Sequence, residues 1–178
     1  FEWQYLRDIY DKKILGTIFH EHMYHHSITS LKNLFDENDL NFYDVERVNI
    51  QKGSIIGYVT KNIYKEKTFR FKQLLSEEKK YKYNSPKKLG ELKKFIQNQK
   101  KNDEKILKKF DKKLIGSFGS ARSGPTYALN FGLSKYINYI FDDHPLKKNR
   151  FTSFLNQKVY PTNKIYKIKY WYFYIEKI

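Results

Sequence analysis

Hydrophobic side chains recur at the spacing of an amphipathic helix in four segments of the chain. These segments predict helices over residues 2–13, 27–38, 64–81 and 86–110. Before the last of them, Ser85 is a suitable N-cap and Pro86 a suitable first helical residue. A turn rich in glycine leads into a fifth predicted helix, over 126–133. The pattern therefore predicts helices throughout the chain, with a long pair in its middle.

Alternating or continuous apolar runs between these helices predict strands. They cover residues 14–19, 40–50, 53–60, 114–119, 136–141, 158–160 and 165–170. The order strand, glycine turn, helix and strand ending at Asp142 is that of a βαβ unit with a parallel sheet. We therefore predict an α/β fold: a Rossmann-like parallel sheet with flanking helices and a long Lys-rich helical insertion. With no repeat or long linker, residues 1–178 are predicted to form a single domain.

The composition sets limits on the class of protein. A chain of 178 residues can bury roughly two-thirds of its unfolded surface, and 40% of this one is apolar, including 16 Tyr and 14 Phe. The absence of cysteine excludes disulfides, thiolate-bound zinc and a cysteine nucleophile. No apolar run reaches the ~20 residues of a membrane span, and no signal peptide opens the chain, so we expect a soluble cytoplasmic protein. Because the sequence opens at Phe1 without Met, we expect a processed chain or a fragment of a longer protein.

The chain is strongly basic, with 35 Lys and Arg against 19 Asp and Glu and a net charge of +16. Only five of the basic residues are Arg, the side chain best suited to bidentate contacts with phosphate and bases. Segment 76–113 holds 14 Lys and six acids, a net +8, and is interpreted as a solvated helical face or an anion-binding surface. A lysine-rich codon bias accounts for the excess, so nucleic-acid binding is not expected.

The glycine turn between Gly116 and Thr126 is the first candidate site. Glycines at such a turn let backbone N–H groups approach a phosphate at a helix N-terminus, although the spacing matches neither the dinucleotide nor the P-loop fingerprint. A tight structural turn between strand and helix remains an alternative. Asp142 follows about 20 residues on, either as a ribose-binding acid or as part of a capped loop. The candidate ligand-binding residues here are Gly119, Ser120, Arg122, Ser123, Thr126 and Asp142.

A histidine cluster is the second candidate site. Four of the five histidines lie in segment 20–26, but the metalloprotease pattern H-E-x-x-H fails because Tyr24 takes the place of its second histidine. A three-ligand metal site, a histidine–carboxylate acid/base pair and surface histidines without a function all remain open. The acid/base pair would be Glu21 and His22.

Four segments, in order along the chain, share motifs with one family. They are IFHEHMY (18–24), GSIIGY (53–58), GSARSGPTYALNF (119–131) and YIFDDHPLKK (139–148). They resemble YHEHxxY, GGSxRxY, GASARS-TLLNY and YIFDDNPLKQG of the SAM-dependent sugar C-methyltransferases, and more narrowly their C-terminal domain. Trp171 stands where that family has Trp-Asn.

The resemblance implies a function. In such an enzyme His22 would be the general base that removes a proton beside the ketone of a nucleotide-linked keto-sugar, and Glu21 would orient it. Tyr24 and the glycine turn would bind the sugar nucleotide. The family also has a zinc-binding and a SAM-binding domain, which are expected upstream, so SAM would bind outside this chain and the chain alone would be inactive. We expect no metal and no membrane partner. The alternative is a non-catalytic module that binds a nucleotide or nucleotide-sugar.

Overall fold

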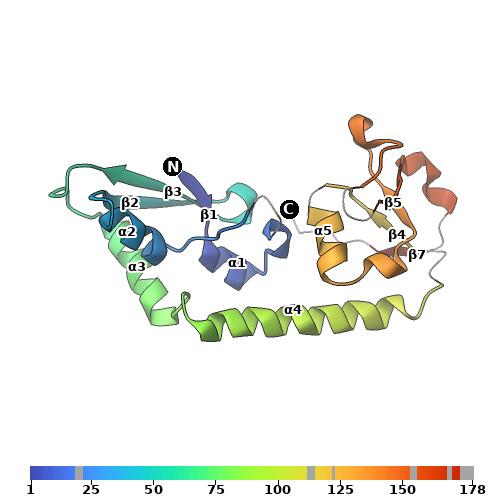
Figure 1. The fold of residues 1–178 in the computed structure, drawn as a ribbon, viewed down its shortest axis with the longest axis horizontal. Helices are drawn as coiled ribbons and strands as arrows, with labels where there is room; N and C mark the ends of the chain where they lie inside the picture. The colour runs from blue at the N-terminus through green and yellow to red at the C-terminus, as the bar shows by residue number, and fades with distance from the viewer. Residues whose placement is uncertain (19–21, 112–114, 122, 153–155, 168–169, 173–178) are drawn as a thin grey trace. The chain divides into compact units, whose positions relative to one another are not determined.

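The computed structural model describes the chain except for residues 19–21, 112–114, 122, 153–155, 168–169 and 173–178. The chain divides into two compact units. The first unit contains residues 1–14 and 22–93, and the second contains residues 15–21 and 94–177. The units are described separately below, and Figure 1 shows the elements of each.

The first unit is an antiparallel sheet covered by helices. Its strands, in the order β1-β3-β2, are β1 (Glu2–Gln4), β3 (Ser54–Thr60) and β2 (Asn41–Val48). Its helices are α1 (Leu6–Lys12), α2 (Ile28–Asp36), α3 (Phe69–Tyr81) and the first turns of α4 (Pro86–Leu107), with the 3₁₀ turn η2 (Ile50–Lys52) between β2 and β3. Helices α2 and α3 contact β2.

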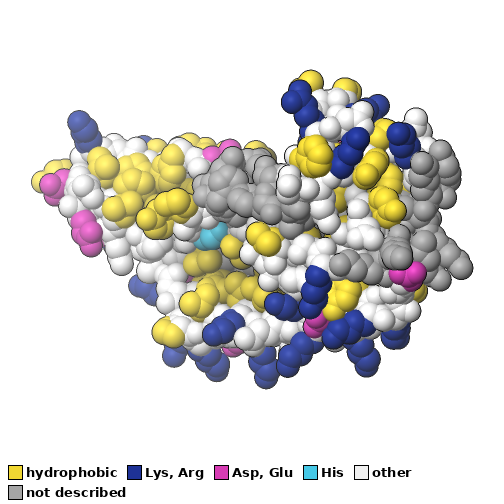
Figure 2. Space-filling view, turned by 45° about the vertical axis from the view of Figure 1, so that its right-hand side comes forward, with side chains coloured by type: hydrophobic (Ala, Val, Ile, Leu, Met, Phe, Trp, Pro, Cys, Tyr) yellow, Lys and Arg dark blue, Asp and Glu magenta, His cyan; other side chains and the backbone are white. Residues whose placement is uncertain are grey.

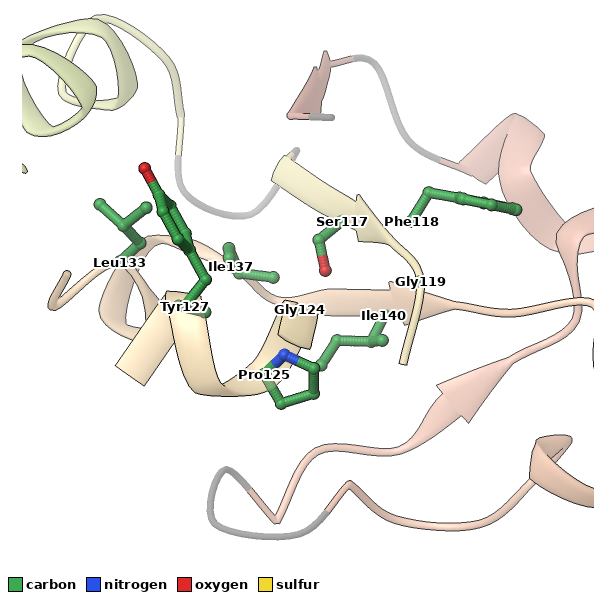
Figure 3. Close-up of a pocket in the computed structure, with 10 residues that line it drawn as sticks. Ser117, Phe118, Gly119, Gly124, Pro125, Tyr127, Leu133, Ile137 and Ile140 are labelled. Carbon is green, nitrogen blue, oxygen red and sulfur yellow. The ribbon is translucent and has the colours of Figure 1, made fainter. Parts of the chain in front are cut away.

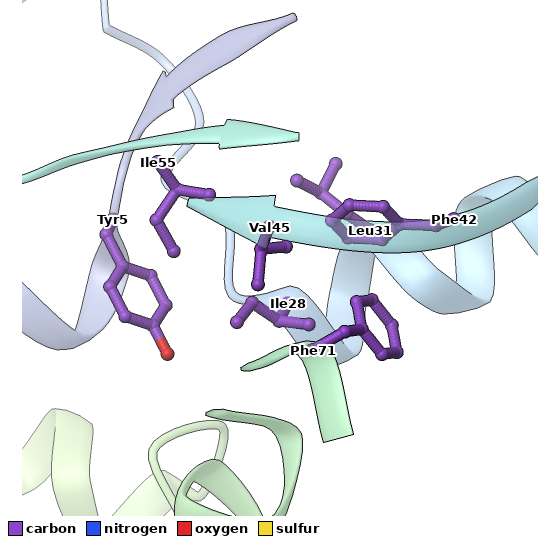
Figure 4. Close-up of a cluster of buried hydrophobic side chains, with 7 residues drawn as sticks. All are labelled: Tyr5, Ile28, Leu31, Phe42, Val45, Ile55 and Phe71. Carbon is purple, nitrogen blue, oxygen red and sulfur yellow. The ribbon is translucent and has the colours of Figure 1, made fainter. Parts of the chain in front are cut away.

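The core of this unit joins the sheet to its helices (Figure 4). Phe42 of β2 and Phe71 of α3, both fully buried, meet edge to face with ring centroids 4.9 Å apart. Each such side chain contributes about 1.5–3 kcal/mol through burial. The cluster consists of Tyr5, Ile28, Leu31, Phe42, Val45, Ile55 and Phe71.

The second unit is built on a parallel sheet in the order β6-β5-β4-β7. The strands are β4 (Ile115–Phe118), β5 (Tyr139–Phe141), β6 (Val159–Tyr160) and β7 (Tyr170–Tyr172), and α5 (Ser123–Asn130) connects β4 to β5. Short 3₁₀ turns complete it: η1 (Leu15–Thr17), η4 (Ser134–Tyr136), η5 (Pro145–Lys147) and η6 (Thr162–Lys167). The predicted mixed α/β fold and the parallel β4-α5-β5 unit are therefore confirmed, with a separate antiparallel sheet in addition.

Three predicted elements differ from the structure. The helix predicted over 2–13 begins as strand β1, because Trp3 pairs with Ile55 of β3. The strand predicted over 14–19 is the 3₁₀ turn η1 in its described part. Of the strand predicted over 165–170, residues 165–167 lie in the 3₁₀ turn η6, and Tyr170 belongs to β7. In each case a local apolar pattern could not reveal which segment would supply a hydrogen-bonding edge.

Helix α4 begins at the predicted place, where the N–H of Lys88 donates to Ser85 Oγ at 3.3 Å. It buries Leu92, Asp103 and Leu107 and presents most of its lysines to solvent. The exposed ones are Lys87, Lys93, Lys94, Lys100, Lys101 and Lys105. Figure 2 shows lysine and arginine side chains gathered along one edge of the surface, where this helix runs. No helix in the part of the chain that the structure describes is long and apolar enough to cross a membrane.

Candidate functional site

The glycine turn connects the end of β4 to the start of α5. Gly119 has φ +97°, a left-handed conformation that disfavours side chains, and its N–H donates to the carbonyl of Phe141 at 2.8 Å. At Gly124 the constraint is space, because a Cβ would lie 2.8 Å from the carbonyl oxygen of Gly119. Both glycines are therefore required by the shape of the turn itself.

Asp142 follows β5 and binds this turn. Its Oδ2 accepts hydrogen bonds from the backbone N–H and the hydroxyl of Ser120, both at 2.8 Å, and from Lys147 Nζ at 3.0 Å. Its Oδ1 accepts from the N–H of His144 at 2.9 Å. The carboxylate thus joins the β4–α5 turn to the segment after β5, as adjacent parallel strands allow.

The environment of Asp142 keeps it ionised. Burial alone would raise the pKa of this carboxyl, but the hydrogen bonds from Ser120, His144 and Lys147 stabilise the charged form more strongly. The net effect holds the pKa of Asp142 far below its usual range. At neutral pH both oxygens therefore act only as acceptors.

A small apolar cavity of about 20 Å³ lies beside the turn (Figure 3). Its lining residues are Ser117, Phe118, Gly119, Gly124, Pro125, Tyr127, Ala128, Leu133, Ile137 and Ile140. This volume holds about one water molecule, so the cavity could receive only the edge of a larger ligand. The hydroxyl of Tyr127 donates to the buried Asp103 of α4 at 3.0 Å, which fixes one wall of the cavity.

Several candidate residues gather at this turn. Gly119, Ser120 and Asp142 come together directly, while Thr126 lies half-buried in α5. Ser123 is the first residue of α5. Arg122 lies outside the described residues. Sequence reasoning missed Lys147, although its position five residues after Asp142, in a turn begun by Pro145, was an available signal.

Residues 22–26 of the histidine segment lie in the first unit and are anchored through their backbone. The carbonyl of His26 accepts from the N–H of Leu6 at 3.0 Å and from Trp3 Nε1 at 3.2 Å. The rings of His22 and His25 are 6.2 Å apart, and the exposed ring of Tyr24 stacks on His26 at 6.3 Å.

The ring of His25 is partly buried. Its Nε2 is buried and has no hydrogen-bond partner among the residues that the structure describes. Burial, and then the neighbouring His22 and His26, lower the pKa of His25. Glu21, the predicted partner of His22, lies outside the described residues. Among the residues that the structure describes, no group of three His, Asp or Glu is arranged to hold a metal ion.

Glu78 of α3 fixes the helix that follows this segment, and sequence reasoning did not find it. It is buried, its Oε1 accepts from the N–H of Ile28 at 2.7 Å, and its Oε2 accepts from Thr29. Ser27 adds a capping box with Ser30. In sequence Glu78 stands among surface-type residues of a Lys-rich helix, and no local signal distinguishes it.

The described part of the histidine segment, residues 22–26, belongs to the first unit, whereas the glycine turn lies in the second. The second unit supplies a parallel βαβ turn with an ionised aspartate beneath it, at the strand ends where ligands bind in α/β folds. This arrangement is typical of an α/β ligand-binding domain.

Residues 49–175 match the family described as C-methyltransferase C-terminal domain, and the chain belongs to this family. The predicted resemblance is thereby confirmed, and with it a role related to methyl transfer. The matched range includes the glycine turn, Asp142 and Trp171, and it begins after the histidine segment. None of the curated proteins compared matches the chain.

Proposed function

We propose that this chain is the substrate-side domain of a SAM-dependent C-methyltransferase that acts on a nucleotide-linked keto-sugar. The observation that carries the proposal is the family match over residues 49–175, because it covers the β4–α5 turn and the segment that contains Asp142. The whole of 1–178 would serve as one functional domain, with α4 as a Lys-rich insertion in a Rossmann-like arrangement. The zinc-binding and SAM-binding domains would be supplied by a separate part of the enzyme.

His22 would act as the general base, oriented by Glu21. The base takes a proton from the carbon beside the ketone, and the electrons of the broken C–H bond form an enolate. That carbon then takes the methyl group that SAM supplies when bound. Two features hold the backbone that follows His22: the hydrogen bonds to the carbonyl of His26, and Glu78, which fixes the start of α2.

SAM is expected to bind outside this chain. In a nucleotide-binding βαβ unit, the acid after the second strand is free to accept from ribose hydroxyls. Here the carboxylate of Asp142 is already bonded to Ser120, His144 and Lys147. The turn therefore lacks the free ribose-binding acid that a SAM site of this fold uses. We propose instead that the sugar nucleotide is contacted by Gly119, Ser120, Ser123 and Thr126, with Arg122 and Tyr24. Asp142 would act indirectly, by holding Ser120 in position.

The test separates proton removal from methyl transfer. The chain is combined with its upstream methyltransferase domains, and a nucleotide-linked keto-sugar is incubated in D₂O without SAM. Deuterium should enter beside the ketone, and with SAM added a methyl group should appear at that carbon by mass spectrometry. His22→Asn should reduce both by 10²-fold or more, the order of magnitude of general base catalysis.

The matched control is His26→Asn, since His26 contacts Trp3 and Leu6 through its backbone carbonyl. This variant should retain most of the activity. Full exchange in His22→Asn would show that another group is the base, while binding of the sugar nucleotide without exchange or methylation would favour a non-catalytic module.

A further inference from the structure

Both hydrogen-bond donors of Ser120, its backbone N–H and its hydroxyl, are used by Asp142. An ionised carboxylate can only accept, so the hydroxyl hydrogen of Ser120 must point to Asp142 Oδ2, 2.8 Å away. The backbone N–H of Ser120 points to the same oxygen. What remains for a ligand is the lone-pair side of Ser120 Oγ, which accepts a hydrogen bond and cannot donate one.

Two neighbouring N–H groups of the turn are also used within the chain. The N–H of Gly119 donates to Phe141 at 2.8 Å, and that of Gly124 donates to Ala121 at 3.1 Å. A phosphate bound at a turn of this kind needs these donors, because its oxygens only accept. Asp142, with Lys147 bonded to its Oδ2 at 3.0 Å, thus places a carboxylate where such a turn would otherwise hold a bound anion.

The surroundings of the turn suit an uncharged ring. The adjoining cavity is lined mostly by apolar side chains, among them Pro125 and Ile140. Phe118 is 41% exposed and extends from the end of β4 on the side away from Tyr127 (Figure 3). A sugar or ribose ring can lay its C–H face on such a surface and donate a hydroxyl hydrogen to Ser120 Oγ.

We propose that Asp142 is a specificity-determining residue, which makes the β4–α5 turn a site for an uncharged ring with a hydroxyl donor and excludes phosphate from it. This inference rests on the proposed function and deepens it. It assigns the turn to the sugar or nucleoside portion of a sugar nucleotide and requires the diphosphate to be bound elsewhere.

Three probes test the inference on the 178-residue chain by ¹H–¹⁵N NMR at pH 7: methyl β-glucoside, uridine and inorganic pyrophosphate. At least one ring probe should shift the amide signals of Gly119, Ser120 and Gly124, whereas pyrophosphate should leave them in place. The inference is wrong if pyrophosphate shifts these amides in the unmodified chain, or if neither ring probe does.

Asp142→Asn should gain affinity for pyrophosphate, a result that is not expected if Asp142 has a structural role only. Without the negative charge, the turn should bind pyrophosphate about tenfold more tightly. Asp143→Asn is the matched control, since it removes the same charge one residue away, where the carboxylate contacts Thr162 and not Ser120. Equal pyrophosphate binding by the two variants would overturn the inference.

Ser120→Ala keeps the test decisive if Asp142→Asn does not fold. It preserves the backbone N–H bond to Asp142 and removes the hydroxyl, that is, the acceptor oxygen together with its own hydrogen bond to Asp142. Ring-probe binding should therefore weaken, and pyrophosphate should still not bind. Unchanged ring-probe binding in this variant would contradict the inference. The methylation assay fails or succeeds independently of these titrations, so the two proposals can be separated.

Discussion

Glu78 holds Thr29 by two hydrogen bonds: its Oε2 accepts from the backbone N–H at 2.8 Å and from the hydroxyl at 2.6 Å. The second oxygen accepts from Ile28, so one carboxylate from α3 satisfies two N–H groups at the start of α2. The histidine segment enters α2 directly through Ser27. The position of that segment therefore depends on a residue about fifty positions away in sequence.

Glu78→Gln should destabilise the first unit. The amide nitrogen that replaces one oxygen is a donor, and it would face an N–H group that also needs an acceptor. Leaving one such buried group unsatisfied costs about 1–3 kcal/mol, which should lower the urea midpoint measurably. The control is Glu91→Gln, because Glu91 is an exposed residue paired with Lys88, and its loss should leave the urea midpoint nearly unchanged. Equal effects of the two substitutions would contradict the role of Glu78.

Gly124→Ala should destabilise the second unit and distort the glycine turn. The new methyl group would lie 2.8 Å from the carbonyl oxygen of Gly119, a backbone atom that cannot move away cheaply. We expect the free energy of unfolding to fall by about 1–3 kcal/mol, as measured by thermal unfolding. The NMR signals of Ser120 should also shift.

The matched control is Gly90→Ala in α4, where the same methyl group would meet nothing within 4 Å. In an exposed helix interior, alanine should raise the stability by about 0.5–1 kcal/mol. The two glycine substitutions should therefore change stability in opposite directions, and a loss of stability in both would argue against the close approach at Gly124.

Asp142 should make the stability of the second unit dependent on pH in the acid range. Its pKa is lower in the folded chain than in the unfolded one, so the unfolded chain binds the proton more readily. The contribution is complete above the unfolded value of about 4 and is lost progressively as the pH falls below it. The stability difference between the unmodified chain and Asp142→Asn should thus be largest near pH 6 and shrink towards pH 3, as measured by urea unfolding. A constant difference over this range would show that the carboxylate is not stabilised as described.

His25 should also make the chain less stable as the pH falls, but in a higher pH range than Asp142. Burial, with His22 and His26 nearby, lowers the pKa of His25 from its ordinary value of 6.5, so the folded first unit favours the neutral ring. The stability contribution is present above about pH 6.5 and is lost as the pH falls towards the folded pKa. NMR titration of the His25 ring should show a midpoint below 6.5, and His25→Asn should reduce the loss of stability between pH 7 and pH 5. A midpoint at or above 6.5 would contradict the burial of Nε2.

Part of the candidate site followed from sequence order. A strand, a glycine turn, a helix and a second parallel strand place the two strand ends side by side, so Gly119, Ser120 and Asp142 were expected at one edge. What Asp142 does there was not predictable, because its pairing with Ser120 and Lys147 depends on side-chain geometry across two loops. The positions of Glu21 and Arg122 lie outside the described residues, and their roles stay predictions.

The sequence by itself determined the elements whose signals are local. Ser85 and Pro86 start α4, Ser27 starts α2, and periodic apolar residues define β2 and β3, because caps and amphipathic spacing act within a few residues. The tertiary structure alone decided that residues 2–4 form a strand, that Glu78 holds the start of α2 and that Asp142 takes the donors of Ser120. Each of these depends on hydrogen bonds between residues 22 to more than 50 positions apart, and no short-range pattern encodes such partners.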